Sequence, residues 1–212
     1  SGTEYIDTGI VVTAGLGMFS KGIFRGVNQW SLGTRNASTI SSATVAFVSS
    51  APGSTSKYCL KSFGTAHDFV SYSVQNNGRY EETIKIVDFG AEKYALQGGK
   101  SETGSNSMPT KMGTQTGSYS IVLFGVNTSG TITKSSNIAL CRVVFFDGSV
   151  PIADYLPCLD GNGVACMWDN IAQEYVYNDG TGDFSYGSSV TPTELDPVYW
   201  QKINGTWEVI HQ

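Results

Sequence analysis

Short runs of apolar, aromatic and β-branched residues recur about every ten residues along the chain, and Gly, Ser, Asn and Asp separate them. This spacing is typical of antiparallel sandwiches and barrels, in which each short strand ends in a turn. No segment favours a helix. We predict strands at residues 5–12, 23–32, 44–49, 58–63, 69–75, 82–88, 93–96, 119–126, 139–146, 152–157, 165–169 and 174–177.

Two glycine-containing dipeptides predict tight hairpin turns within this pattern. Asn77-Gly78 and Asp147-Gly148 each lie between two apolar runs, and both tolerate the positive φ that two-residue hairpin turns require. Residues 98–118, in contrast, contain too few apolar side chains for a core strand. We predict a long loop there, which either carries binding residues or only connects two strands.

The alternation of side chains along the predicted strands assigns residues to faces. At 143–146 both faces are apolar, so one face should meet the core while the other is covered or binds a ligand. Trp168 lies in the short strand after the turn that begins at Gly161, and we predict that it belongs to the core.

The composition changes near Gly187, where Ser, Thr and two prolines precede a segment that contains tryptophan. Prolines and small polar residues are typical of linkers. We therefore predict a main domain at 1–186, a linker at 187–197 and a C-terminal β-hairpin extension at 198–212.

The predicted extension has Asn204-Gly205 at its tip, which places Trp200 and Trp207 on one face and Tyr199 on the other. An isolated hairpin with two apolar faces is unstable in water. We expect Tyr199, Trp200 and Trp207 to form an interface with the main domain, with a neighbouring domain, or with another subunit in a homo-oligomer.

The composition fits one compact domain, since 40% of the 212 residues are hydrophobic and 15% are charged. No uncharged apolar stretch approaches the roughly 20 residues that cross a bilayer, so we expect a soluble protein without membrane insertion. The first residues have neither the basic nor the apolar region of a signal peptide. We expect any secretion signal to have been removed earlier or never to have existed.

The charges are distributed unevenly. Residues 1–150 carry 12 Lys and Arg against 9 Asp and Glu, whereas residues 151–212 carry Lys202 against 9 acidic residues. No basic stripe is present that would neutralise phosphates, which excludes nucleic acid as an expected partner. An acidic segment favours either a solvated surface or a bound cation.

The cysteines and histidines predict no zinc site. Cys59, Cys141, Cys158 and Cys166 form no Cys-x-x-Cys pair, and neither His67 nor His211 has metal-ligand spacing. The even number of cysteines permits disulfides, but a domain of this length does not need them, so we predict buried free thiols.

Several segments carry a family pattern: IALCRVVFFDGSVPIADYLPC at 138–158, NGVACMWDN at 162–170, EYVYNDGTGDF at 174–184, GTEYIDTG at 2–9, LGTRN at 32–36 and IVLFGVNTSGT at 121–131. Together they resemble concanavalin A-like (LamG-like) jelly-roll domains, which are common in phage tail and receptor-binding proteins and in surface proteins of gut bacteria. The resemblance implies an all-β fold, a concanavalin A-like β-sandwich of two antiparallel sheets, here followed by the short C-terminal hairpin.

The same resemblance leaves the ligand open, because this superfamily includes glycan binders, glycoside hydrolases and modules that only build assemblies. Its hydrolases place their acids in a Glu-x-Asp-x-x-Glu type strand, and a retaining glycosidase needs two carboxylates about 5–5.5 Å apart. This chain has no such motif, and Glu81 and Glu82 face opposite sides of an extended strand. We expect no catalytic activity.

Glycan binding requires exposed aromatic rings beside polar side chains. The combination that we predict for the ligand site is Trp30, Arg35, Asn36, Tyr72, Asn76, Asn77 and Tyr80. The alternative is structural: the aromatic residues lie in the core and the asparagines turn the chain.

Calcium is the cofactor that the acidic segment favours. Asp160, Asn162, Asp179 and Asp183 offer oxygen ligands on turns, although the twelve-residue EF-hand loop is absent. Residues that form turns explain the same pattern.

We expect a non-catalytic module that binds a cell-surface glycan and recognises a receptor, within a phage tail or fibre or a bacterial surface protein. Its location would be the virion or the cell exterior, next to other domains or subunits of the parent protein. One alternative is a structural assembly module without a glycan ligand. Another is an endo-acting hydrolase whose carboxylates meet only in the fold.

Overall fold

The computed structural model describes the fold through a set of strands and the turns between them. Side chains are described at 4–13, 15–22, 30–38, 117–133 and 138–186. Backbone pairing alone is described at 23–24, 29, 46–51, 57–58, 72–73, 81–88, 93–98, 101–107, 199–203 and 206–210. The described residues form strands and turns and no helix, and hence no helix that could cross a membrane.

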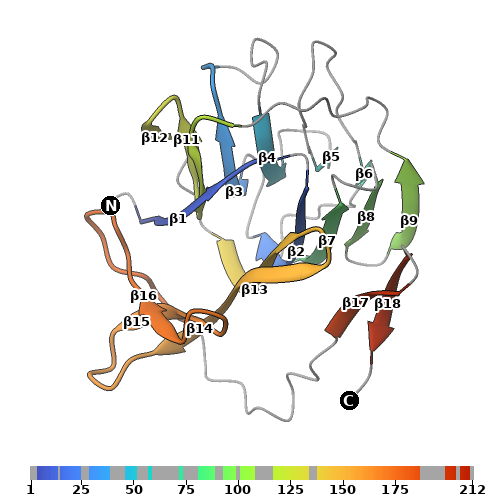
Figure 1. Cartoon of the computed structure of the whole chain (residues 1–212). Coiled ribbons are helices and arrows are strands. Elements are labelled where there is room, and N and C mark those ends of the chain that lie inside the picture. The colour runs from blue at the N-terminus through green and yellow to red at the C-terminus, as the bar shows by residue number, and fades with distance from the viewer. Residues whose placement is uncertain are drawn as a thin grey trace.

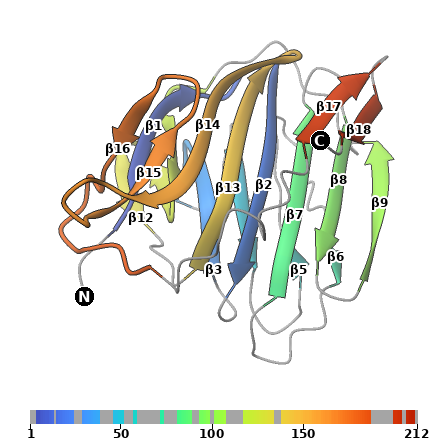
Figure 2. The same cartoon turned by 90° about the horizontal axis from the view of Figure 1, so that it is seen from below.

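Two sheets account for most of the described strands. The larger has eight strands in the order β16 (Glu174–Val176), β15 (Ala165–Asp169), β14 (Val150–Leu159), β13 (Ile138–Asp147), β2 (Leu16–Phe24), β7 (Glu81–Asp88), β8 (Lys93–Gly98) and β9 (Ser101–Ser107). The smaller has six: β1 (Ile6–Val11), β10 (Ser120–Leu123), β3 (Gln29–Arg35), β11 (Val126–Thr128), β12 (Thr131–Thr133) and, paired with β3, β4 (Ala46–Ala51). Figures 1 and 2 show them as two layers.

The core lies between the two layers. Val143, Phe145 and Tyr155 of the larger sheet pack in one buried cluster with Ile6 and Leu123 of the smaller sheet. Side chains alternate between the two faces of a strand, and alternate residues such as Val143 and Phe145 of β13 or Ala153 and Tyr155 of β14 reach this cluster. The residues between them face away from it, and this alternation makes the fold a β-sandwich.

One pairing differs from the predicted antiparallel scheme. The chain reverses after β10 at Phe124, whose φ of 65° is positive, and β11 then runs parallel to β3. The predicted strand at 119–126 is therefore wrong in its second half, because the bend at Phe124 divides it into β10 and β11. Apolar residues on both sides of the bend conceal it in the sequence.

Two further expectations are wrong. The predicted strand at 23–32 consists of the end of β2 and most of β3, which belong to different sheets. The predicted loop at 98–118 contains β9, which pairs with β8 at the edge of the larger sheet. An edge strand is held by backbone hydrogen bonds on one side, so it does not need the apolar residues whose absence suggested a loop.

Both of the predicted hairpins that lie in described segments are present. β13 and β14 pair up to Asp147 and Val150, with Gly148 at a φ of 58° as the first of two turn residues. β17 (Tyr199–Ile203) pairs with β18 (Thr206–Ile210) in the predicted register, with Trp200 opposite Val209. The other predicted turn, Asn77-Gly78, lies outside the described residues. Two short strands, β5 (Lys57–Tyr58) and β6 (Tyr72–Ser73), pair separately.

The side chains at 143–146 are buried on both faces of their strand. Val143 and Phe145 are buried in the core, and Val144 and Phe146 are buried on the opposite face. The second face of β13 is therefore covered and is not open to a ligand.

The β14–β16 end of the larger sheet curls toward β1, as Figures 1 and 2 show. Past β16 the chain reaches β1, where the Tyr5 N–H donates to Asn178 Oδ1 (3.0 Å) and the Asp179 N–H donates to the Tyr5 carbonyl (2.9 Å). The Asp7 N–H donates to Asp179 Oδ2 at 2.7 Å. These bonds join the edges of the two sheets and fix the orientation of β14–β16.

Candidate functional site

The outer face of β14–β16 carries two rows of side chains that face away from the core. In the first row, Leu156 of β14 lies opposite Trp168 of β15, which lies opposite Tyr175 of β16. Cys158 and Cys166 lie opposite each other in the second row. Tyr155 and Met167, which alternate with these residues, belong to the core cluster.

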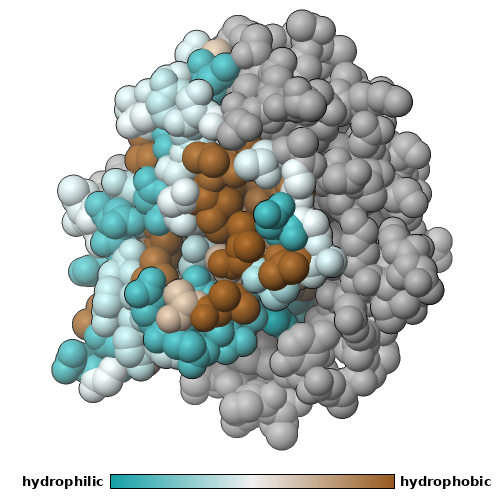
Figure 3. Space-filling model, viewed as in Figure 1, coloured by the Kyte–Doolittle hydropathy of each residue, from teal (hydrophilic) through white to brown (hydrophobic). Residues whose placement is uncertain are grey.

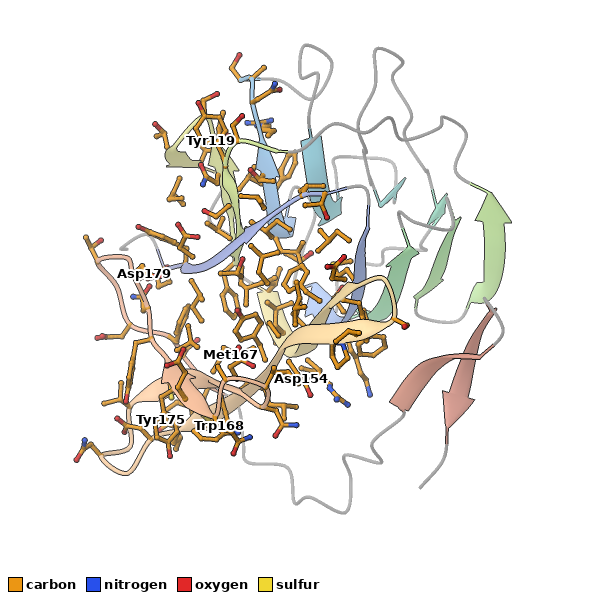
Figure 4. All side chains as sticks on the ribbon, in the orientation of Figure 1. Tyr119, Asp154, Met167, Trp168, Tyr175 and Asp179 are labelled. Atoms are coloured by element: carbon orange, nitrogen blue, oxygen red, sulfur yellow. The ribbon has the colours of Figure 1, made fainter. Side chains whose placement is uncertain are left out.

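Aromatic rings dominate this face. The ring centroids of Trp168 and Tyr175 are 5.1 Å apart at 66°, and those of Tyr175 and Tyr177 are 6.3 Å apart at 47°. Tyr175 is 44% exposed, Tyr177 is 45% exposed and Trp168 is half-buried. We name Trp168, Tyr175 and Tyr177 the aromatic face; Figure 4 shows Trp168 and Tyr175 together on the side of β15 and β16 that points away from β1.

The turn between β14 and β15 supports Tyr177. Asp160 Oδ1 accepts hydrogen bonds from the N–H groups of Asn162 and Val164, both at 2.8 Å, and Oδ2 accepts one from the Tyr177 hydroxyl at 3.0 Å. These bonds, with that from Val164 the strongest, lower the pKa of Asp160, and the bond to Asp160 raises the pKa of Tyr177. The carboxylate therefore stays ionised and holds the phenol in place.

The turn between β15 and β16 is held by Asp169. Its Oδ1 accepts from the N–H groups of Ile171 (2.9 Å) and Asp154 (3.1 Å), and the Gln173 N–H donates to the Asp169 carbonyl (2.8 Å). Gln173 adopts a φ of 59° to close the turn. Buried Asp169 thereby sets the register in which Tyr175 comes opposite Trp168.

An ion pair lies further along the same outer face. Arg142 Nε and Nη2 donate to the two carboxylate oxygens of Asp154 at 2.9 and 2.8 Å. Such bidentate pairs are geometrically specific, and this one fixes β13 against β14. The carboxylates of Asp154 and Asp169 are thus both engaged in structural hydrogen bonds.

The segment that carries the aromatic face is acidic. Residues 151–186 contain six Asp and Glu and no Lys, Arg or His. A negative field disfavours anionic ligands. The arrangement therefore suits an uncharged ligand with an apolar surface that stacks on aromatic rings and hydroxyl groups that form hydrogen bonds.

The predicted ligand residues on β3 lie together, but they contact the protein itself. The Arg35 guanidinium carbon lies 5.8 Å from the centroid of the Trp30 ring, and half-buried Trp30 packs on Val126. Arg35 is 5% exposed, its Nε donates to Thr128 Oγ1 at 2.9 Å, and burial lowers its pKa. Thr128 in turn bonds to Thr133 at 2.8 Å. We name Trp30, Arg35 and Thr128 the β3 corner; Asn36 follows it, half-buried, just after the end of the strand.

The remaining predicted ligand and interface residues have no described side chains. Tyr72 pairs through its backbone with Tyr58, whereas Asn76, Asn77 and Tyr80 lie outside the described residues. The candidate interface residues are described by backbone pairing alone: Tyr199 opposite Ile210, Trp200 opposite Val209 and Trp207 opposite Lys202. Their roles stay predictions.

The four candidate calcium ligands occupy two separate turns. Asp160 is engaged as described above, and Asn162 lies in the same turn. Asp179 bonds to the Asp7 N–H, and Asp183 is exposed four residues further on. Within the part of the chain that the structure describes, no three His, Cys, Asp or Glu side chains gather where they could hold a metal ion.

Apolar residues are also exposed away from the aromatic face. Figure 3 shows a patch of them near the middle of the view, where β1 ends and the β13–β14 hairpin turns, within a mostly hydrophilic surround. Val150 and Ile152 at the start of β14 are both exposed. Ile152 is the extra residue in a β-bulge, since Phe145 pairs with Ala153 and Phe146 with Pro151.

Sequence reasoning missed the aromatic face, because it assigned Trp168 to the core. The signal was present: Glu174-Tyr-Val-Tyr alternates, which places Tyr175 and Tyr177 on one face of a strand. What the sequence does not show is which face of the hairpin meets the core. Met167, next to Trp168, occupies the core position instead.

No protein-family model matches the chain, and no curated protein is significantly similar to it.

Proposed function

We propose that this chain is a non-catalytic carbohydrate-binding module, built as a concanavalin A-like β-sandwich in a phage tail or fibre or a bacterial surface protein. The two-layer all-β architecture supports the proposal at the level of the fold. The proposed location and role rest on the family resemblance, which is carried by the segments at 138–158, 162–170 and 174–184. It implies a module outside the cell or on the virion that recognises glycans on a cell surface.

The observation that carries the proposal is the aromatic face. Tyr175 and Tyr177 keep nearly half of their surface exposed, although they lie against other aromatic rings. Rings that the protein already holds lose little conformational entropy when a ligand stacks on them. A pyranose ring presents an apolar C–H surface of similar size, so the aromatic face can bind one sugar ring and orient its neighbours.

The ligand is expected to be a neutral glycan. Six acidic residues and no basic residue at 151–186 would repel a uronate, a sialate or a sulfated sugar. The Tyr177 hydroxyl donates a hydrogen bond to Asp160, so its oxygen can accept a hydrogen bond from a sugar hydroxyl. Binding of this kind requires no metal ion.

Recognition without catalysis is consistent with how the nearby carboxylates are used. Asp160 accepts two main-chain bonds and the Tyr177 hydroxyl, Asp169 caps a turn, and Asp154 pairs with Arg142. A glycosidase needs one carboxyl group as a proton donor and a second as a nucleophile or base. We propose that these three acids hold the hairpins together.

The test is a glycan array that presents neutral and acidic oligosaccharides to the 212-residue chain, followed by titration calorimetry with the best neutral ligand. Tyr175→Ala and Tyr177→Ala should each weaken binding about tenfold or more, since each removes a stacking ring. Tyr186→Ala is the matched control: Tyr186 is 67% exposed and contacts no other ring among the described residues. Binding should persist in a calcium chelator.

Three outcomes would overturn the proposal. Silence across the array, with and without calcium, would favour the assembly module, in which Tyr199, Trp200 and Trp207 contact a neighbouring subunit. Binding that survives both tyrosine substitutions but fails in Trp30→Ala would move the site to the β3 corner. Cleavage of any of these oligosaccharides in solution would show that the chain is a hydrolase.

A further inference from the structure

Two cysteines lie directly opposite each other across β14 and β15. Cys158 and Cys166 are Cα partners in the antiparallel register, and their sulfur atoms are 3.4 Å apart. Cα atoms of such partners are about 4.5–5.5 Å apart, which lies within the 4.4–6.8 Å range that disulfides span. The strands therefore already hold the two residues at a separation that a disulfide accepts.

The surroundings of the two thiols differ. Cys166 is 4% exposed, and burial together with the hydrogen bond to Cys158 raises its pKa to about 12. Cys158 is only half-buried, so it is the sulfur that a reagent in solution can reach first. Neither Cys158 nor Cys166 is part of a disulfide in the structure.

We propose that Cys158 and Cys166 form a thiol–disulfide site, which a low-molecular-weight disulfide such as oxidised glutathione converts into a cross-strand disulfide. The proposal does not depend on glycan binding. Its grounds are the register, the sulfur separation and the unequal exposure of the two thiols.

The reaction proceeds in two exchange steps. The Cys158 thiol loses its proton to water, and the thiolate attacks one sulfur of the reagent, which forms a mixed disulfide and releases one thiolate. Cys166 then loses its proton and attacks the Cys158 sulfur, which closes the protein disulfide and releases the second thiolate. Two protein thiols are oxidised and one small disulfide is reduced to two thiols, so electrons and atoms balance.

The disulfide would lock the hairpin next to the aromatic face. The turn that Asp160 organises lies between the two cysteines in the chain, and Asp160 also anchors Tyr177. Closing this loop removes conformations from the unfolded chain, and we expect the melting temperature to rise by about 5 °C. Reduction with a dithiol should reverse the change.

The experiment treats the 212-residue chain with oxidised glutathione at pH 8 and follows its intact mass and its non-reducing peptide map. We expect the loss of two hydrogen atoms and a single linked peptide pair that joins the Cys158 and Cys166 segments. Because the buried thiol must ionise, closure should accelerate as the pH rises from 7 to 9.

Substitutions separate this site from the other thiols. Cys158→Ala and Cys166→Ala should each abolish both the mass loss and the shift in melting temperature, whereas Cys141→Ala should keep both. Persistent glutathione on Cys158 without closure, or chains linked to one another in place of an internal bridge, would overturn the proposal. The wild-type map decides the matter even where a variant folds poorly, and it reads the same whether or not the chain binds a glycan.

Discussion

The aromatic face and the β3 corner contain similar residues and differ in what those residues contact. Each combines a half-buried tryptophan with polar side chains on neighbouring strands. At the β3 corner, Arg35 is buried and its Nε donates a hydrogen bond to the Thr128 hydroxyl, which is itself hydrogen-bonded to the Thr133 hydroxyl. On the aromatic face, the polar bonds lie at the rims of the rings and leave Tyr175 and Tyr177 open to solvent.

Residue type alone therefore does not distinguish a binding site from a cluster that stabilises the fold. A guanidinium that stacks on an indole is a good sugar contact when it is exposed and a good strand brace when it is buried. Burial converts the β3 corner into part of the scaffold, whereas exposure leaves the aromatic face available. Three predictions follow from this comparison, in addition to the two experiments above.

The largest effect is expected for Arg35→Ala. The substitution removes the guanidinium that lies over the Trp30 ring and the bond to Thr128, so we expect a loss of about 3 kcal/mol in the free energy of unfolding, measured by urea denaturation. Glycan affinity should stay the same at temperatures where the variant is folded. Unchanged stability together with lost binding would show that the comparison is wrong and that Arg35 is a ligand residue. Arg35→Lys, which keeps the charge but not the planar group, should lie between.

The two tryptophans provide a matched test of intermediate size. Trp30→Ala should lower the free energy of unfolding by about 2 kcal/mol, because Trp30 packs on Val126 and Arg35, and should leave glycan binding unchanged. Trp168→Ala should weaken binding about tenfold, because Tyr175 loses the ring against which it packs. Calorimetric titration and thermal melts of both variants measure the two quantities. Equal effects of both substitutions on binding would remove the distinction between the regions.

The smallest effect is expected from acid titration of the Asp160 turn. The pKa of Asp160 is lower in the folded chain than in the unfolded chain, so its bonds contribute fully above the unfolded value and are lost as the pH falls through the lowered folded value. We expect binding to be constant from pH 7 to about 4 and to weaken modestly only at lower pH, where Asp160 of the folded chain becomes protonated. Tyr177→Phe removes one bond to the carboxylate, so the pKa of Asp160 should rise in an NMR titration. A pKa that does not change would show that Asp160 does not anchor Tyr177.

The sequence predicted well those elements whose strands alternate and end in clear turns. The strand at 165–169 has the predicted bounds, and the C-terminal hairpin has the predicted register. The β13–β14 hairpin is present, with Gly148 and Ser149 as its two turn residues. The prediction failed where apolar residues lie on both sides of a change of sheet. Residues 23–32 are apolar on both sides of such a change, and whether a strand continues there depends on its partners: Phe24 pairs with Glu81, whereas Gln29 pairs with Ala51.

The candidate site could be predicted from the sequence only in part, for a related reason. The residues of the aromatic face were visible as an aromatic pattern, and the acidic character of the segment around them could be counted. The exposure of the aromatic face could not be predicted, because Met167 and Trp168 are adjacent and both are residue types that suit a core. The opposite sulfur atoms of Cys158 and Cys166 also escaped notice, since eight positions separate them in the sequence and only the register of β14 and β15 brings them together.

By itself, the sequence determined that the chain forms strands and tight turns around one apolar core, because alternation and turn residues act over a few positions. The tertiary structure decided which face of each hairpin met that core, that β11 runs parallel to β3, and that the arm after β16 joins the two sheets at β1. These outcomes depend on contacts between segments that are distant in the sequence, such as β3 and β11, whose Arg35 and Thr128 are 93 positions apart. Local patterns cannot specify such contacts, because the free energy that selects among them comes from burial in the assembled sandwich.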